Sequence, residues 1–267
     1  MDERDALNAC VSDLRAEGDD LWSLLQTLEG ADWQRETAFK AWTVYDVVEH
    51  LRASDFAGVT TLRGAEHFRS LVRSAEQPQA APEPRATGSE LLRIWRLQFQ
   101  ELCQGLANAN PEQRLAWVGP GMRPRMFASA RQMETWAHGW AIYDLLGARR
   151  VHTDRIRNIA TLGVKTFAWA FRNRGLDVPT EPPFVRLVSP SGDVWQWNDP
   201  EAPHRVEGDA VAFCQTVTQV RNIADTTLDI RGDIAERWMA IAQCFAGPPE
   251  DPPTPGSRGP RNRRSGS

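Results

Sequence analysis

The stretch TVYDVVEHL, residues 43–51, decides how the first part of the chain folds. Thr43 and Asp46 have the spacing of a capping box, in which a hydroxyl caps the first helical turn and an acid three residues later caps in return. A helix is therefore expected to begin at Val44. His50 follows among apolar neighbours, so its side chain should face the interior of a helical bundle. A lone histidine there is ordinarily a satisfied core residue, and partners are needed before it counts as a ligand.

The sequence around this stretch has the apolar periodicity of further helices. Leucines and other apolar residues recur at three- and four-residue steps. The predicted helices cover residues 3–28, 44–72, 91–107 and 126–146, the last ending at Gly147. Gly58 and Gly64 are possible breaks in the second of them. Between the second and third, the Pro- and Ala-rich residues 77–89 predict a long crossover loop. Residues 1–150 therefore predict a four-helix bundle with unequal connections.

Beyond residue 150 the pattern changes to a mixture of helices and strands. Residues 183–199, PFVRLVSPSGDVWQWND, predict a hairpin around a Ser-Pro-Ser-Gly turn. Further strands are expected in HRVEG and TTLDIRG, with helices over residues 153–174, 209–221 and 233–247. Residues 151–247 thus predict a small α+β domain. Residues 248–267, rich in Pro, Gly, Ser and Arg, predict a disordered tail.

Composition narrows the class of function. The chain has 267 residues, with 31 basic against 35 acidic side chains and a net charge of -4, which gives no electrostatic footprint for nucleic acid. No run approaches the roughly 20 uncharged apolar residues of a membrane span, and the charged opening MDERDALNAC does not resemble an export signal. We expect a cytoplasmic protein that acts on a small molecule, with no nucleic-acid or membrane partner. Its oligomeric state stays open.

Two residues of the fourth predicted helix are candidate partners for His50. Glu134 and His138 are four residues apart, so they project from one helical face about one turn apart. An exposed side-chain pair is the simpler interpretation of these two alone. Together with His50, however, they make a set of two imidazoles and one carboxylate. Such a set suits a metal ion and leaves coordination positions open. The four cysteines show no CxxC spacing and are expected to be buried thiols.

These motifs resemble a known family. Residues 41–51, AWTVYDVVEHL, and residues 131–139, RQMETWAHG, resemble the two signatures of the DinB-like metal-binding bundles in their mycothiol-dependent maleylpyruvate isomerase branch. Residues 205–209, 213–215 and 242–247 resemble the sterol-carrier-protein-like domain that follows the bundle in this branch. The resemblance implies an α domain followed by a smaller α+β domain: a DinB-like four-helix bundle and a sterol-carrier-like C-terminal domain.

The resemblance also implies a chemistry. It assigns His50, Glu134 and His138 to one divalent metal ion, most commonly zinc, with nickel or iron as alternatives. The resemblance implies mycothiol as the co-substrate. Coordination to the metal would lower the pKa of its thiol and so supply a thiolate at neutral pH. A thiolate added to an activated double bond permits rotation and expulsion, which is isomerisation, or it stays attached, which is S-transfer.

The sequence departs from this family at one point near the predicted ligands. Relatives carry a polar pair after the His-Gly of the second signature, whereas Trp140-Ala141 stands here. This change predicts a more aromatic cavity and a flatter or more hydrophobic substrate. We assign substrate binding to Trp140 and to Tyr143 on the same helix, although aromatic residues at helical spacing are ordinarily core. Trp42 is expected to be core as well.

Three further polar residues are assigned at this stage. Arg221 is expected to grip a substrate carboxylate, with a solvated surface arginine as the alternative. Asp46 and Asp144 are candidate acceptors that could orient a ligating histidine. For Asp46, a helix cap is the favoured interpretation.

Three functions follow as hypotheses. The first is a metal-dependent enzyme that activates a mycothiol-type thiol for S-transfer to, or isomerisation of, an electrophilic small molecule. The second is a metal-dependent tailoring enzyme of secondary metabolism that uses no thiol and promotes cyclisation, elimination or hydrolysis. The third is a binding protein without catalytic activity that holds a small apolar ligand.

Overall fold

The computed structural model describes residues 2–75, 85–119 and 121–259. The chain forms two compact units, Met1–Gly139 and Trp140–Ser267. The division falls inside the helix Pro124–Leu146, whereas the sequence predicts the boundary after residue 150. The domain limits stay a prediction.

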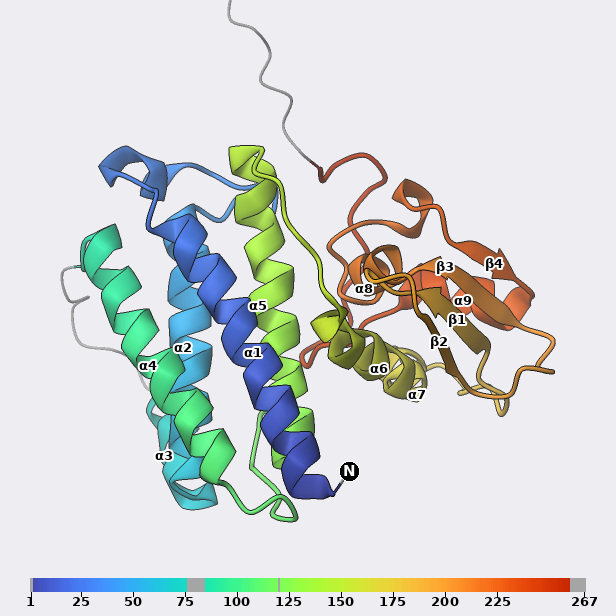
Figure 1. The fold of residues 1–267 in the computed structure, drawn as a ribbon, viewed down its shortest axis with the longest axis horizontal. Coiled ribbons are helices and arrows are strands. Elements are labelled where there is room, and N and C mark those ends of the chain that lie inside the picture. Colours follow the sequence, from blue (N-terminus) through green and yellow to red (C-terminus); the bar gives the residue numbers. More distant parts are fainter. Residues whose placement is uncertain (1, 76–84, 120, 260–267) are drawn as a thin grey trace, which may run out of the picture. The chain divides into compact units, whose positions relative to one another are not determined.

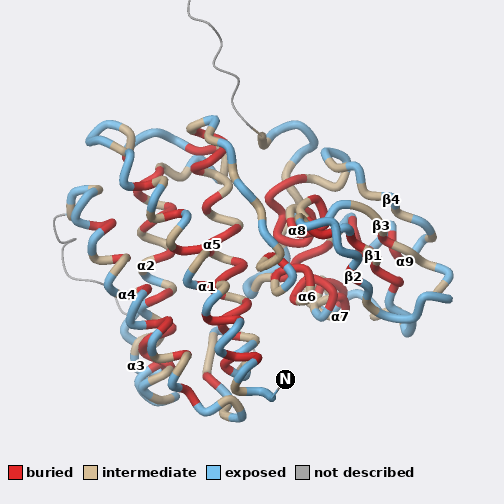
Figure 2. The backbone as a smooth tube through the Cα atoms, in the orientation of Figure 1, coloured by how far each residue is buried: buried red, intermediate tan, exposed pale blue. Residues whose placement is uncertain are grey.

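The first unit is built around the helices expected from the sequence (Figure 1). These are α1 (Glu3–Leu25), α2 (Val44–Leu62), α4 (Gly88–Asn108) and α5 (Pro124–Leu146), with η1 (Gly30–Gln34) and α3 (Ala65–Ala75) beside them. The apolar face predicted for α4 is confirmed, because Trp95, Phe99 and Leu102 are each at most 1% exposed. In Figure 2 the buried residues follow the inner sides of these helices. The bundle is therefore held by one apolar core.

The helix ends follow the turn chemistry of the sequence, with two additions. Gly64 has a φ of 135° and separates α2 from α3, so the second predicted helix is broken at one of the two glycines expected to break it. Gly147 has a φ of 61° and ends α5 as predicted. Most of the predicted crossover loop 77–89 lies outside the described residues; α4 begins at Gly88, capped by the Thr87 hydroxyl.

The second unit combines helices with a four-stranded sheet in its described part. Its helices are η2 (Asp154–Ile156), α6 (Arg157–Lys165), α7 (Phe167–Arg172), α8 (Ala210–Val217), η3 (Ile223–Asp225) and α9 (Asp233–Ile241). The single helix predicted over 153–174 is interrupted at Thr166, whose hydroxyl donates to the backbone oxygens of Leu162 and Gly163. Side-chain bonds of this kind compete with helical bonds, which accounts for the break.

The sheet has the strand order β2-β1-β3-β4 (Figure 1). Its strands are β1 (Phe184–Val188), β2 (Val194–Trp197), β3 (Arg205–Asp209) and β4 (Asp229–Arg231). The predicted hairpin is confirmed, because β1 pairs antiparallel with β2 around a turn whose Gly192 has a φ of 95°. β3 pairs parallel with β1 and antiparallel with β4. The protein therefore has the predicted fold class, a helical bundle with a smaller C-terminal α+β domain.

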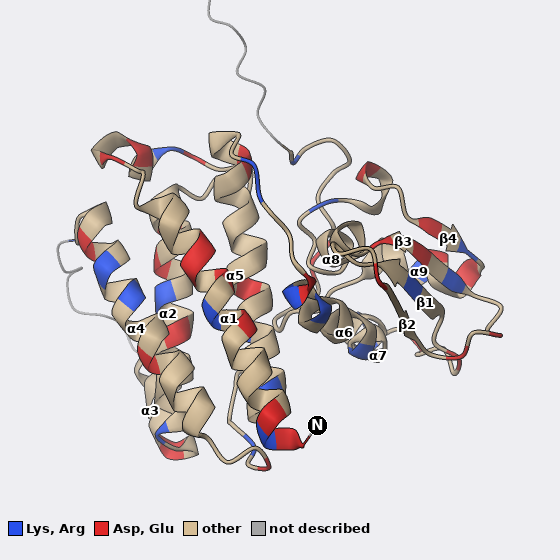
Figure 3. Ribbon diagram, viewed as in Figure 1, with Lys and Arg blue, Asp and Glu red and all other residues tan. Residues whose placement is uncertain are grey.

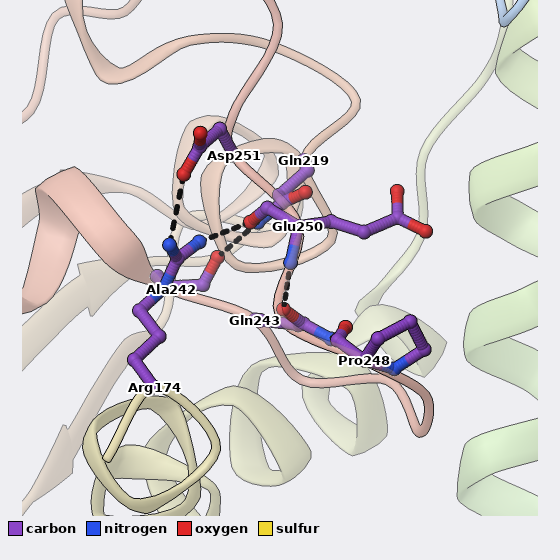
Figure 4. A network of polar contacts seen from close by, with 7 residues as sticks. All are labelled: Arg174, Gln219, Ala242, Gln243, Pro248, Glu250 and Asp251. Atoms are coloured by element: carbon purple, nitrogen blue, oxygen red, sulfur yellow. Dashed lines mark hydrogen bonds and ion pairs between the residues drawn. The ribbon is translucent and has the colours of Figure 1, made fainter. Parts of the chain in front are cut away.

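Residues 248–259, part of the predicted disordered tail, follow an irregular path fixed by hydrogen bonds (Figure 4). The backbone oxygen of Glu250 accepts from Gln219 Nε2 at 2.8 Å and also from Arg174, which bonds Asp251 at 2.8 Å. The Glu250 amide donates to Gln243 Oε1 at 2.9 Å. Composition cannot register such partners, because they lie in other elements. Residues 260–267 of that tail lie outside the described part.

The surface carries both signs of charge. In Figure 3, basic and acidic residues are interspersed along the helices and strands that face the viewer. In the described part of the chain, no helix combines the length and the apolar character that crossing a bilayer requires.

Gly18 in α1 tests how tightly the bundle is packed. A Cβ on Gly18 would lie 2.3 Å from ring atoms of Phe99, a ring that is only 1% exposed. Overpacking costs about 1–3 kcal/mol, more than the ~1 kcal/mol gained in helix propensity. We predict that Gly18→Ala lowers the free energy of unfolding by about 1–2 kcal/mol in urea denaturation.

Gly30→Ala is the matched control, because nothing lies within 4 Å of its added Cβ. It should leave stability near wild type. In a Phe99→Leu background the Gly18→Ala substitution should cost less, since the ring it meets is gone. Wild-type stability of Gly18→Ala itself would contradict this account of the core.

Candidate metal centre

The capping box that starts α2 is present and sets the position of His50. The Thr43 hydroxyl accepts from the Asp46 amide at 3.2 Å, and Asp46 Oδ2 accepts from the Thr43 amide at 3.1 Å and its hydroxyl at 2.7 Å. Asp46 is thus a helix cap, as favoured from the sequence, and its carboxylate is occupied by Thr43. The cap fixes where α2 begins, and His50 follows about one and a half turns into the helix.

The structure brings His50 together with Glu134 and His138. Glu134 Oε2 lies 3.2 Å from His138 Nε2 and 3.7 Å from His50 Nε2. One ligand atom from each residue lies within 4.8 Å of the others. The pair on α5 has the i, i+4 relation expected from its spacing, and α2 supplies the third donor. Two imidazole nitrogens and a carboxylate oxygen are ligands that zinc and related divalent ions accept, so the donor set fits such an ion.

The surroundings shift the pKa values of Glu134 and His138. Burial alone would raise the pKa of the Glu134 carboxyl, but hydrogen bonds from His138 and His50, and the charge of Arg131, lower it well below its usual range. Burial lowers the pKa of His138, although Glu134 opposes this. At neutral pH, Glu134 is therefore a carboxylate and His138 a neutral imidazole. The three side chains are 12–35% exposed, so the cluster is partly open to solvent.

Two aromatic rings lie against the histidines of the cluster. The Trp42 ring is nearly parallel to that of His138, with centroids 6.0 Å apart, and lies 5.3 Å from that of His50. Phe39 meets His138 edge to face at 5.0 Å. Both aromatic side chains are half-buried. The sequence favours a core role for Trp42, and its contact with both histidines is learned only from the structure.

A tight turn places these rings. The Trp42 amide donates to the Phe39 oxygen at 2.9 Å, and the Trp42 oxygen accepts from the Thr37 amide at 2.8 Å. Between the two rings, Lys40 and Ala41 have φ values of 52° and 54°, a left-handed conformation that costs side-chain-bearing residues roughly 1–3 kcal/mol each. No glycine or asparagine marks this turn, so the sequence gives no signal for the position of Phe39.

The residues assigned to substrate binding gather in the second unit. Arg221 is 8% exposed, so the alternative of a solvated surface arginine is wrong. Its Nη2 donates to Asp144 Oδ1 at 2.7 Å, which occupies the carboxylate considered as a histidine acceptor. The guanidiniums of Arg221 and Arg150 lie 5.1 and 5.2 Å from the Trp140 ring, and Arg150 lies 4.8 Å from that of Tyr143. Substrate binding by Trp140, Tyr143 and Arg221 stays a prediction.

The other three histidines of the chain, His67, His152 and His204, have different surroundings. His67 is exposed, and His152 stacks on Trp140 with ring centroids 5.4 Å apart. His204 is half-buried, with Nδ1 3.5 Å from Asp233 Oδ1. Among the His, Cys, Asp and Glu residues in the described part of the chain, His50, Glu134 and His138 form the group of three whose ligand atoms lie close enough together to hold a metal ion.

Comparisons with known proteins identify the family. The model of the mycothiol maleylpyruvate isomerase N-terminal domain matches residues 14–143. Two relatives from Mycobacterium tuberculosis strains, Uncharacterized protein MT0041 and Uncharacterized protein Rv0036c, are each 40% identical over 246 residues, covering 90% of this chain and 96% of theirs.

Solved structures agree with this assignment at the level of the fold. The crystal structure of the mycothiol-dependent maleylpyruvate isomerase superposes with a TM-score of 0.52 at 14% identity, covering 79% of this chain and 88% of that one. A mutant of that enzyme gives the same TM-score at 13% identity. On the family model, residues 14–143 of the chain belong to the mycothiol maleylpyruvate isomerase N-terminal domain family.

Proposed function

We propose that this protein is a metal-dependent enzyme that activates a mycothiol-type thiol. The thiol either isomerises an electrophilic small molecule or becomes attached to it through sulfur. The observation that carries the proposal is the cluster of His50, Glu134 and His138, whose ligand atoms lie within 4.8 Å of one another. Structural zinc sites ordinarily have four protein ligands, whereas three leave room for a further molecule. A donor set of this size favours a catalytic centre over a structural one.

The roles of the residues follow from their contacts. His50 and His138 would hold a divalent ion through Nε2 and Glu134 through Oε2, and the bound ion would supply a Lewis acid that lowers the pKa of a thiol. Trp42 and Phe39 lie against the ligand rings, limit their rotation and exclude water from that side.

The electrophile is proposed from the chemistry of a thiolate. The sulfur forms a bond to one carbon of a conjugated double bond, and the displaced electron pair moves onto the adjoining carbonyl oxygen. Rotation about the resulting single bond, followed by return of the electron pair and loss of the thiolate, gives the isomer. The name of the solved relative, a mycothiol-dependent maleylpyruvate isomerase, supports this reaction class.

The protein's own cysteines support an external thiol. Cys10, Cys103, Cys214 and Cys244 are all buried. Burial raises the pKa of Cys10 to about 11 and that of Cys103 to about 12, and raises that of Cys214 well above its usual value. A thiol with such a pKa holds a negligible thiolate fraction at neutral pH. Their burial therefore favours a nucleophilic sulfur that arrives with a co-substrate.

A second candidate function keeps the metal and dispenses with the thiol. The half-buried Trp42 and Phe39 rings give the centre an aromatic surrounding. Such a site favours a flat or apolar substrate whose carbonyl is polarised for cyclisation, elimination or hydrolysis. The two candidates differ in whether turnover depends on a thiol.

The metal assignment is tested by elemental analysis of protein purified without added metal. About one divalent ion per chain is expected, because three donors on two helices make one site. The double variant His50→Ala/His138→Ala should lose it, since a single carboxylate binds such an ion weakly. His67→Ala, which removes an exposed histidine, is the matched control and should keep its ion. Full occupancy of the double variant would sink the assignment.

Thiol dependence is tested by incubating metal-loaded protein with a conjugated cis-configured oxo acid, with and without mycothiol. Nuclear magnetic resonance follows the cis and trans forms, and mass spectrometry follows any thiol adduct. Turnover is expected only when mycothiol is present, because the protein holds no accessible thiolate of its own. Equal turnover without thiol would reject the leading proposal and favour the second candidate.

The state of the protein's own thiols is tested with a thiol-specific chromogenic reagent at pH 8. A pKa of about 11 leaves about one thiol in a thousand ionised at that pH, and burial blocks access as well. We predict no fast labelling of the folded protein and labelling of all four cysteines in denaturant. Rapid reaction of one cysteine in the folded protein would point instead to an enzyme-borne nucleophile.

A further inference from the structure

A buried ion pair joins the two helices that carry the candidate ligands. Asp55 on α2 is 0% exposed and Arg131 on α5 is 3% exposed. Arg131 Nε donates to Asp55 Oδ1 at 3.0 Å, and Arg131 Nη2 lies 2.9 Å from the same oxygen. The other oxygen, Oδ2, accepts from Trp95 Nε1 on α4 at 2.9 Å. One carboxylate therefore ties three helices of the bundle together.

Stability alone does not explain charges at this depth. Moving a carboxylate and a guanidinium out of water is costly, and well-packed apolar side chains of similar volume commonly give equal or greater stability. The cost is visible at Asp55, where burial raises the pKa of the carboxyl and Arg131 and the Trp95 N–H oppose the rise. Neither residue belongs to the cluster of ligands. We therefore consider how the pair constrains the position of α2 relative to α5.

The position of the pair along the helices links it to the metal centre. Asp55 follows His50 by five residues in α2, a rise of about 7 Å. Arg131 precedes Glu134 by three residues and His138 by seven, so the three lie on one face of α5. The ion pair and the ligands thus lie along the same contact between α2 and α5. A rotation or slide of either helix that broke the pair would also separate His50 from Glu134 and His138.

We propose that Asp55 and Arg131 are positioning residues of the metal centre. Their charged hydrogen bonds are directional and fix the rotation and register of α2 against α5. Apolar packing is non-directional and would hold the helices together without choosing among neighbouring registers. The proposal rests on the proposed metal function, and it assigns neither residue to contact with the ion or the substrate.

The test separates metal affinity from stability. The variant Asp55→Leu/Arg131→Met/Trp95→Phe replaces the network by apolar side chains, the third change removing the indole N–H that would lose its acceptor. Zinc affinity of metal-free protein is measured by competition with a chromophoric chelator, and the melting temperature by circular dichroism. We expect a melting temperature near wild type and zinc affinity 10- to 100-fold weaker, as for other groups that orient ligands without touching the metal. The visible spectrum of the cobalt-loaded protein should change as well.

A second variant and a control complete the design. Asp55→Asn keeps the shape and an acceptor for Trp95 but loses the charge; it should also bind zinc at least tenfold more weakly, and it serves if the triple variant does not fold. Leu25→Ala removes a fully buried side chain from α1. It should lower the melting temperature and leave zinc affinity and the cobalt spectrum unchanged.

The outcomes distinguish the two proposals. Wild-type zinc affinity and cobalt spectrum in the triple variant or in Asp55→Asn would overturn the positioning role while leaving the metal centre intact. A matching loss of affinity in Leu25→Ala would also overturn it, since stability would then explain the effect. If wild type binds zinc no better than His50→Ala/His138→Ala, both proposals fall.

Discussion

The structure depends on one geometric constraint, that donors from residues 50, 134 and 138 meet within 4.8 Å. α5 supplies two of them at the i, i+4 spacing, which needs only a regular helix. The third comes from α2 and requires a fixed relation between two helices that are distant in the sequence. The capping box at Thr43 sets where α2 begins, and the bundle core sets how it packs. Most of the packing in the first unit therefore holds α2 and α5 in the relation that brings these three side chains together.

The support has local costs that the rest of the bundle offsets. Two consecutive left-handed residues, Lys40 and Ala41, are strained, and Asp55 and Arg131 are desolvated. Strain and buried charge of this kind persist only where surrounding structure over-determines them, and they cluster at functional sites. Here both occur beside the same three side chains. The extensive apolar packing of α1, α2 and α4 is what allows the bundle to retain them.

The sequence predicts what depends on local rules. Residue types and their spacing predicted the cap at Thr43, the helix end at Gly147 and the β1–β2 hairpin. They also predicted the pairing of Glu134 with His138. Each of these features is decided within a few residues. The turn that seats Phe39, the bond between Arg221 and Asp144, and the path of residues 248–259 were out of reach. Each depends on partners from distant elements, and no residue type at those positions predicts which residue the partner is.

The placement of sulfur in this chain bears on its chemistry. A cysteine thiolate beside two histidines and a carboxylate would complete a four-ligand site and close it. All four cysteines are instead buried elsewhere, and those with a resolved shift have a raised pKa. The donors of the proposed metal centre are therefore nitrogen and oxygen, and the proposed co-substrate would supply the sulfur. A site with hard and borderline donors, flanked by the Trp42 and Phe39 rings, would fit the proposed reaction of a small thiol with an electrophile.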